Sequence, residues 1–264
     1  MSLRDFSLRR YRKRILPLGI LVLLTVVTGK ACGASWDGLL SGLVKGYSFL
    51  GHLFPPDWKA FPEMIGPAVE SIVIALLATL FGTLLSLCFA MAAAANISYR
   101  WLRSLSRAII AIERSLPEII IILILVAVFG LGPVPGVLAL TLGCIGMLGK
   151  LFADAIEEID PITIESIAAV GANKGQIIVF GVLPQIMPRV ITYAMFRFEI
   201  NIRLSVLLGA VGAGGIGYEL DSAFNMLQYH RAFTALIVTL LLVFLTERLS
   251  GHLRKKVKAE GALK

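Results

Sequence analysis

Residues 71–95, SIVIALLATLFGTLLSLCFAMAAAA, form an uncharged stretch of 25 residues. About 20 consecutive apolar residues are enough to cross the hydrocarbon core of a membrane as a helix, so this stretch predicts a transmembrane helix. The composition of the whole chain agrees. Of its 264 residues, 57% are hydrophobic and 16% are charged, against roughly 25% charged in an average soluble domain. The mean hydropathy of +0.84 is typical of a polytopic membrane protein.

The rest of the chain supplies five further candidate spans. Residues 119–149 are uncharged and are interrupted by GLGPVPG at 130–136, which indicates two spans joined by a tight turn. Another span contains Arg197, Glu199 and Arg203; Arg197 has no partner at helical spacing and is expected to extend toward the cytoplasmic interface. We predict an all-α, polytopic membrane protein with six transmembrane helices, at about residues 15–32, 68–95, 105–129, 135–153, 188–208 and 231–248.

The Lys and Arg residues are unevenly divided between the two sides of these six spans. With the N-terminus inside, 18 of the 25 lie on the cytoplasmic side and 4 lie outside. Lys and Arg concentrate in cytoplasmic loops, so both termini are expected in the cytoplasm, and the net charge of +8 does not indicate nucleic-acid binding. A cleaved signal peptide at the N-terminus is the alternative. The expected parts are a cytoplasmic basic arm (1–14), a first span with a periplasmic interfacial segment (15–66), a transmembrane core (67–250) and a cytoplasmic basic tail (251–264).

Residues 165–184, ESIAAVGANKGQIIVFGVLP, are a water-compatible segment between two predicted spans, on the cytoplasmic side. A helix of about two turns is expected to end at Gly171, because glycine readily adopts the left-handed conformation that turns the chain sharply. A second helical stretch over 176–182 is expected to stop at Leu183 and Pro184. Such an element indicates a docking surface for a soluble partner. An ordinary amphipathic loop is the alternative.

A Gly-rich stretch, GAVGAGGIG at 209–217, follows the fifth predicted span. It satisfies the dinucleotide-binding pattern G-x-G-x-x-G, but that pattern requires a preceding strand, and here it follows a transmembrane helix. We interpret it as a sharp, closely packed turn that two subunits can press together; a plain tight turn is the alternative. Its glycines are Gly209, Gly212, Gly214, Gly215 and Gly217.

No motif for catalysis or metal binding is recognisable in the sequence. The stretch GMLGKL at 146–151 is not a nucleotide-binding P-loop. Cys144, two residues before it, stands where that loop needs its first glycine, and Leu151 stands where it needs Ser or Thr. The three His and three Cys are widely scattered, so they predict neither a metal site nor a disulfide framework. We expect no catalytic residue, metal or cofactor in this chain, and the energy for any transport must come from a partner.

The cytoplasmic segment resembles a known signature. Glu165, Gly171, Leu183 and Pro184 have the spacing of the E-A-A-x-x-x-G-x9-I-x-L-P pattern of permease subunits of ABC importers. In that family this element is the coupling helix, which docks in a groove of the cytoplasmic ATPase. The resemblance assigns the coupling segment to about residues 160–186, with the docking role on Glu165, Ala168, Ala169, Gly171, Ala172, Leu183 and Pro184.

This chain departs from the signature at three positions. Ser166 and Ile167 stand where the pattern has alanines, and Gly181 stands where it has isoleucine. A second resemblance narrows the family: residues 114–140 and 196–217, the latter FRFEINIRLSVLLGAVGAGGIG, closely resemble the permease of phosphonate-type ABC importers.

Charged residues in the predicted spans bear on the translocation path. An ionised side chain at the bilayer centre costs from about 3 to more than 10 kcal/mol, so such residues usually face protein or water. Glu199 and Arg203 have the spacing and order of a helical ion pair, and Arg114 and Glu118 form a second candidate pair. One hypothesis is that both pairs are internal and only neutralise themselves. The other is that a water-filled path for an oxyanion is lined by Arg114, Glu199, Asn201 and Arg203.

The resemblance implies a type I ABC importer permease in the bacterial cytoplasmic (inner) membrane. Its expected partners are a second copy of the chain, two cytoplasmic ATP-binding subunits that hold ATP and Mg, and a periplasmic substrate-binding protein. The implied substrate is phosphonate or a related oxyanion: phosphite, hypophosphite or phosphate. The glycine turn would lie near the periplasmic gate.

Three alternatives remain at this point. An ABC importer for a different small solute would share the same motifs. A secondary transporter would usually show broken helices in both halves of the chain, and only one Gly-rich break is recognisable. A membrane enzyme would show convergent His, Asp or Glu at one membrane face, which the sequence does not indicate.

Overall fold

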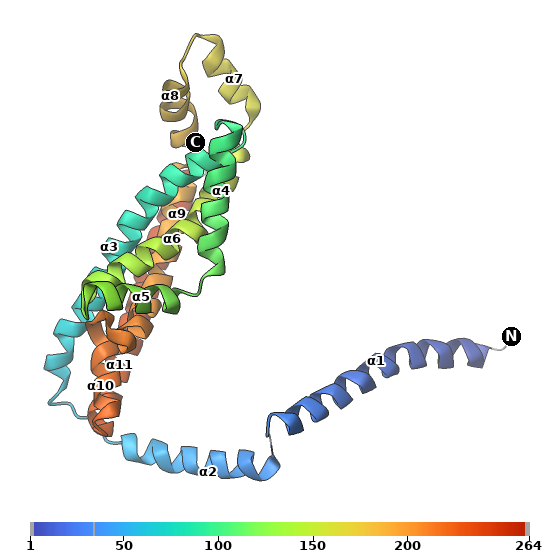
Figure 1. Cartoon of the computed structure of the whole chain (residues 1–264), viewed down its shortest axis with the longest axis vertical. Coiled ribbons are helices and arrows are strands. Elements are labelled where there is room, and N and C mark those ends of the chain that lie inside the picture. The colour runs from blue at the N-terminus through green and yellow to red at the C-terminus, as the bar shows by residue number, and fades with distance from the viewer. Residues whose placement is uncertain (1–2, 34, 262–264) are drawn as a thin grey trace. The chain divides into compact units, whose positions relative to one another are not determined.

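The computed structural model describes residues 3–33 and 35–261, with the side chains of 17–33 and 35–255. Within these residues all regular structure is helical, which confirms the predicted all-α class (Figure 1). The chain divides into two compact units, Met1–Phe54 and Pro55–Lys264. The first two residues of the predicted basic arm and the last three of the predicted basic tail lie outside the described residues.

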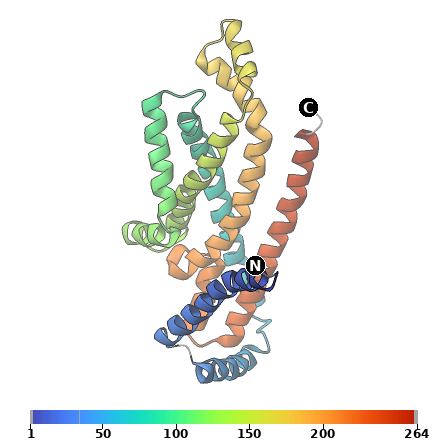
Figure 2. The same cartoon turned by 90° about the vertical axis from the view of Figure 1, so that its right-hand side faces the viewer.

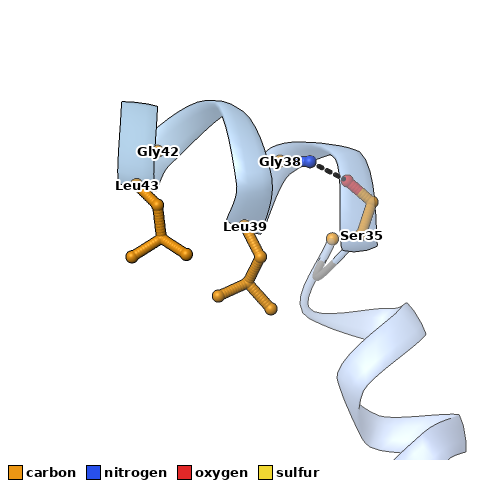
Figure 3. Close-up of a pocket in the computed structure, with 6 residues that line it drawn as sticks. Ser35, Gly38, Leu39, Gly42 and Leu43 are labelled. Atoms are coloured by element: carbon orange, nitrogen blue, oxygen red, sulfur yellow. Dashed lines mark hydrogen bonds between the residues drawn. The ribbon is translucent and has the colours of Figure 1, made fainter. Parts of the chain in front are cut away.

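The first unit consists of α1 (Leu3–Ala31) and α2 (Trp36–Leu53). The portion of α1 from Pro17 onward and α2 meet at an angle of 67°, and together they are long and apolar enough for one broken span or a re-entrant loop. Ser35 begins α2 by accepting a hydrogen bond from the Gly38 amide at 3.0 Å (Figure 3). A pocket of about 390 Å³ lies beside this cap, lined by Gly33, Ser35, Gly38, Leu39, Gly42 and Leu43.

Four helical stretches of the second unit are long and apolar enough to cross a membrane: Phe61–Ala93, Pro133–Glu157, Lys174–Ala213 and Tyr229–Lys255. They include α3 (Phe61–Ala93), α6 (Pro133–Glu157), α9 (Leu183–Leu208) and most of α11 (Tyr229–Gly261). These helices coincide with the predicted second, fourth, fifth and sixth spans. With the α1–α2 pair counted as one span, the described residues hold up to five, so the predicted number of six stays a prediction.

The predicted third span, residues 105–129, is two helices rather than one. α4 (Arg100–Ser115) ends before Leu116, whose ψ of 126° is extended, and α5 (Glu118–Phe129) begins after Pro117. A proline disfavours the helical conformation of the residue before it, which explains the break. With 12 residues, α5 is too short to cross a bilayer alone.

The core of the second unit lies mainly between α3 and α6, with α9 packed on both. Gly82 of α3 faces Cys144 of α6 so closely that a Cβ at position 82 would lie 2.6 Å from the Cys144 Sγ. Ala78 and Ala139 are fully buried in the same core. Small residues at such contacts are typical of membrane helices, because they let backbones approach closely.

The chain runs as one continuous helix from Lys174 to Leu208, through α8 (Lys174–Gln176), a π-helical turn (η1, Ile177–Val182) and α9. The prediction that Leu183 and Pro184 stop the helix is therefore wrong. A proline in a helix lacks an amide donor and its ring crowds the carbonyl one turn earlier. The wider π-helical turn directly before Pro184 accommodates both effects.

The bundle carries short elements at its two ends. α7 (Pro161–Ala169) and α8 project at one end, while α10 (Gly215–Asn225) lies toward the opposite end (Figures 1 and 2). A second π-helical turn (η2, Gly209–Ala213) connects α9 to α10. The continuous helix therefore links the predicted coupling segment to the glycine turn.

Candidate functional site

Local hydrogen bonds define the shape of the predicted coupling segment. Asp160 begins α7 by accepting a bond from the Ile162 amide at 2.9 Å. Gly171 follows α7 with a φ of +85°, which confirms the predicted left-handed turn. Asn173 and Gln176 form a reciprocal capping box at the start of α8, with bonds of 2.8 and 2.9 Å. The turn between α7 and α8 is therefore specified at both ends.

The predicted docking residues lie mostly on the surface of this segment. Glu165, Ala168, Ala169, Gly171 and Pro184 are exposed, and Ala172 and Leu183 are half-buried. Apolar side chains accompany them: Val170 is 84% exposed and Ile162 is 68% exposed. A projecting surface with uncovered apolar side chains is suited to a protein partner.

Two of the three departures from the coupling signature contact each other. Ile167 of α7 is half-buried, and Gly181 of η1 is buried. A Cβ at position 181 would lie 2.8 Å from Ile167 Cδ1, well inside the roughly 3.5–4.0 Å of a normal carbon contact. The large residue at 167 thus occupies the space that a large residue at 181 would fill, so the exchange of sizes preserves the packing of α7 on η1.

Ion pairs anchor the base of the coupling segment to the bundle. Glu157, at the end of α6, pairs with Arg107 of α4 and accepts a bond from the Ala95 amide at 2.6 Å. The next residue, Glu158, pairs with Arg189 of α9. Glu157 and Glu158 lie just before α7, and Arg189 lies after η1. The start of the segment is therefore held to α4, and the Glu158–Arg189 pair holds it to α9.

The predicted ion pairs within single helices are not formed. Glu199 of α9 pairs with Arg254 of α11, at 2.8 Å between Oε1 and Nη2. Arg203 instead donates from Nε to the Glu199 backbone carbonyl at 3.4 Å. Glu118 pairs with a residue of α9 rather than with Arg114. Glu199 and Glu118 each pair with an arginine of another helix rather than with the arginine four residues away in the sequence.

Arg197 is the partner of Glu118, so the expectation that it extends alone toward the interface is wrong. It is 4% exposed, and its Nη2 lies 3.1 Å from Glu118 Oε1. Gly143 of α6 makes room for the pair, because a Cβ there would lie 2.7 Å from Arg197 Nη2. The pair joins α9 to α5 inside the membrane-spanning region.

The residues predicted to line a path fall into two groups. Asn201 is fully buried and donates from Nδ2 to Thr79 Oγ1 at 2.9 Å, and Glu199 is buried in its pair with α11. Arg114 and Arg203 are exposed. The two buried residues hold α9 against its neighbours, and the two arginines remain on the surface of this chain.

The glycine turn requires glycine for two reasons. Gly212, Gly214 and Gly215 have φ values of +101°, +77° and +70°, which L side chains rarely adopt. Gly209 has an ordinary φ but packs tightly, since its Cβ would lie 2.6 Å from the Gly214 carbonyl oxygen. A Cβ at Gly217 would collide with the backbone of Val206. The turn is thus sharp and closely packed, and its contact between two subunits stays a prediction.

Side chains of α3 hold this turn in place. The Gly215 amide donates to Glu70 Oε2 at 3.1 Å, and the Ile216 amide donates to Ser71 Oγ at 3.0 Å. The Gly132 amide, in the α5–α6 connection, donates to the Gly212 carbonyl at 2.8 Å. The turn is therefore coupled to α3 and to the end of α5.

Glu70, Ser71 and Arg254 make contacts that the sequence did not predict. Glu70 is the last charged residue before the uncharged stretch 71–95. A carboxylate at the edge of a predicted span could have indicated a contact with the end of another helix. Arg254 lies among other basic residues of the C-terminal region, where nothing in the sequence distinguishes it.

Comparison with known proteins adds the family. Residues 82–259 match the family described as binding-protein-dependent transport system inner membrane component. The chain belongs to this family. The permease PtxC of the phosphite transport system of Stutzerimonas stutzeri is 38% identical over 221 residues, which cover 83% of this chain and 80% of PtxC. The putative phosphite transport permease HtxC of the same organism is 35% identical over 255 residues, covering 95% of this chain and 90% of HtxC.

Solved structures agree on the fold of this permease. A chain of the MetNI methionine ABC transporter in an inward-facing conformation matches with a TM-score of 0.64 at 23% identity, covering 76% of this chain and 99% of that chain. The protein is thus a multi-pass inner-membrane permease subunit of an ABC importer, with the type I permease fold. Permease subunits of this family carry no ATPase site of their own. The permease therefore works together with other subunits of an ABC transporter.

Proposed function

We propose that this permease carries phosphite or a closely related phosphorus oxyanion, such as a phosphonate, into the cytoplasm. The observation that carries the proposal is the 38% identity to a phosphite transport permease over 83% of the chain. The similarity includes most of the chain, so the pathway and the coupling segment both fall within it.

Two exposed arginines support an assembly of two copies. Arg203 lies within the candidate span Lys174–Ala213 and is exposed, and Arg114 is exposed at the end of α4. Leaving a guanidinium against lipid would cost at least about 3 kcal/mol. A second copy that encloses water over this face removes that cost. In such a dimer the two arginines of each copy supply fixed positive charge to an oxyanion, and Glu199 and Asn201 act behind them by positioning α9.

The coupling segment is the docking surface for an ATPase in this proposal. Two cytoplasmic ATP-binding subunits, which hold ATP and Mg, would each contact one segment through Glu165, its neighbouring alanines and the exposed Val170. Closure of the ATPases would draw the two segments together, and α9 would carry the movement to the glycine turn, the proposed periplasmic gate. A periplasmic substrate-binding protein would deliver the oxyanion at that end. No cofactor is assigned to this chain, and both termini lie in the cytoplasm.

A reconstituted system tests the proposal. The permease, purified with its ATP-binding subunit in proteoliposomes, is expected to accumulate phosphite when the substrate-binding protein and ATP are supplied, and not to accumulate methionine. Arg203→Gln should lower phosphite uptake by about 10-fold or more, since a hydrogen bond to a charged group contributes roughly 1.5–3 kcal/mol. Gly171→Pro should abolish ATP-driven uptake, because proline cannot adopt the positive φ of that turn.

Two outcomes would contradict the proposal separately. Accumulation of methionine without phosphite would refute the substrate. Full ATP-driven uptake by Gly171→Pro would refute the docking role while leaving the substrate intact.

A further inference from the structure

Four charged side chains from three helices lie over two glycines of α6: Glu113, Arg114, Glu118 and Arg197. Gly143 and Gly146 are three residues apart, so they share one face of that helix. A Cβ at position 143 would lie 2.7 Å from Arg197 Nη2 and 3.2 Å from Glu118 Oε1. A Cβ at position 146 would overlap the Glu113 carboxylate and would lie 2.7 Å from Arg114 Cγ. Glycine at both positions therefore lets charges from α4, α5 and α9 gather at one place.

Arg197 has more hydrogen-bond donors than the bundle satisfies. A guanidinium carries five N–H groups. Nη2 meets Glu118 Oε1 at 3.1 Å, and Nη1 lies 3.8 Å from Met147 Sδ, a weak acceptor. Nε is buried and has no hydrogen-bond partner among the described residues. Because a buried donor without a partner is costly, the edge formed by Nε and Nη2 is suited to an oxyanion that accepts two parallel hydrogen bonds.

The carboxylate on Arg197 lies at the accessible side of this cluster. The Glu118 side chain is 30% exposed, whereas Arg197 is buried. One hydrogen bond joins the two side chains, and arginine pairs with an oxyanion more strongly through two. An oxyanion that reaches the cluster from the exposed side therefore meets Glu118 first and competes with it for the same cation.

Arg114 offers Glu118 a second partner. It is exposed, and it forms no ion pair within the part of the chain that the structure describes. Between the two residues the helix is broken: Leu116 and Pro117 have extended ψ values of 126° and 132°, and α5 turns away from the direction of α4 (Figure 1). Residues at the ends of helices absorb changes in backbone dihedral angles. The pair that the sequence spacing suggests is thus an alternative to the pair that the structure shows.

We propose that Arg197 is a transient contact for the transported oxyanion and that Glu118 is its exchangeable counter-ion. The inference rests on the proposed function, which supplies the oxyanion. Glu118 occupies Arg197 when no substrate is present. The arriving oxyanion takes Nε and Nη2 of Arg197, and Glu118 turns to Arg114. When the oxyanion leaves, Glu118 returns.

The charge balance of the cluster suits transport rather than storage. With Glu113 included, two carboxylates face two guanidiniums, so the formal charge is zero. Conduction requires a site that attracts the ion and still releases it. A neutral cluster with an internal competitor holds an oxyanion weakly, and the competing carboxylate assists its release.

The test uses the full chain with its ATP-binding subunit in lipid nanodiscs, with ADP present to fill the nucleotide sites and phosphite as the probe. Phosphite that binds weakly and exchanges rapidly gains line width in its phosphorus NMR spectrum. The double variant Arg197→Met/Glu118→Leu removes the pair but keeps its packing. It is expected to lower the gain in line width at least about 10-fold, while the thermal midpoint stays within about 4 °C of the wild type.

A single variant and a control make the test specific to exchange. Glu118→Gln keeps the shape of the side chain and removes the competing charge, so it should raise the gain in line width by about 5-fold. A pair with a purely structural role would predict no such increase. Lys150→Met/Asp154→Leu removes an exposed ion pair elsewhere on α6 and should change neither the line width nor the thermal midpoint.

The outcomes separate this inference from the proposed function. Equal line widths in the wild type and in Arg197→Met/Glu118→Leu would overturn the exchange, even where ATP-driven phosphite uptake is normal. A decrease in Glu118→Gln at an unchanged thermal midpoint would also overturn it, and the double variant decides alone where Glu118→Gln fails to fold. ATP-driven uptake of sulfate instead of phosphite, lost in the double variant, would support the contact and contradict the proposed substrate.

Discussion

Exchanging the sizes of Ile167 and Gly181 tests whether the coupling segment keeps its packing despite its unusual residues. Gly181→Ile places new atoms in space that Ile167 Cδ1 already occupies, 2.8 Å from the first added carbon. Overpacking of this kind costs about 1–3 kcal/mol. Ile167→Ala removes three carbons from a half-buried side chain, which costs about 1 kcal/mol when the roughly 0.8 kcal/mol per buried methylene is discounted for exposure.

The double variant Ile167→Ala/Gly181→Ile restores one large and one small residue at the contact. Its stability is expected to return to within about 0.5 kcal/mol of the wild type, so the coupling energy of the cycle should be about 2–3 kcal/mol. ATPase stimulation by the loaded binding protein, measured in nanodiscs with the ATP-binding subunit, should fall in each single variant and recover in the double variant. The recovery follows because α7 would again pack at its original position on η1.

Gly175 supplies the matched control on the same segment. It is exposed, and a Cβ there meets only Asn173 Oδ1 at 3.4 Å, an ordinary contact. Gly175→Ile should leave stability and ATPase stimulation nearly unchanged. Additive losses in the double variant would show that residues 167 and 181 do not share one space, and the proposed compensation would then be wrong.

Two further substitutions test the contacts inside the bundle. Glu118→Ala should lower the free energy of unfolding by about 3 kcal/mol, because it leaves the buried Arg197 unpaired. The double variant Arg197→Met/Glu118→Leu should lower it by less than about 1 kcal/mol. SDS unfolding of the purified permease measures both, and equal losses of unfolding free energy in the two variants would contradict the pair. Gly82→Ala should cost about 1–3 kcal/mol by collision with Cys144, and Cys144→Gly should rescue it while Cys144→Ala should not, because alanine keeps the Cβ. Equal rescue in a thermal-shift assay would refute the close contact of α3 and α6.

The sequence was sufficient for features that depend on local composition. Uncharged stretches predicted the long helices, since burial in lipid requires about 20 apolar residues whatever surrounds them. Gly171 and the glycines at 209–217 were recognisable because a positive φ or a close backbone approach excludes most other residues. These requirements act within a few residues of the chain, so a local pattern records them.

Features that depend on tertiary contacts could not be predicted in this way. Glu118 and Arg197 are 79 residues apart, and the helical spacing of Glu118 to Arg114 gave a plausible but wrong partner. Pro184 was expected to end a helix, and the π-helical turn before it lets the helix continue. Each error arose where a contact between helices, or a shift in helical geometry, outweighed the preference of the local sequence.

The continuous helix through α9 provides a physical route between the two ends of the permease. From Lys174 to Leu208 it is about 50 Å long at 1.5 Å per residue, more than the roughly 30 Å hydrocarbon core. Its coupling end is tied to α6 through Arg189, its middle to α5 and α11 through Arg197 and Glu199, and its far end meets the glycine turn that Glu70 holds. Because each of the middle contacts has one buried partner, Arg197 or Glu199, they resist independent sliding of α9. We infer that a displacement of the coupling segment moves α5, α9 and α11 together, and that the glycine turn is where this motion is converted into a change at the opposite face.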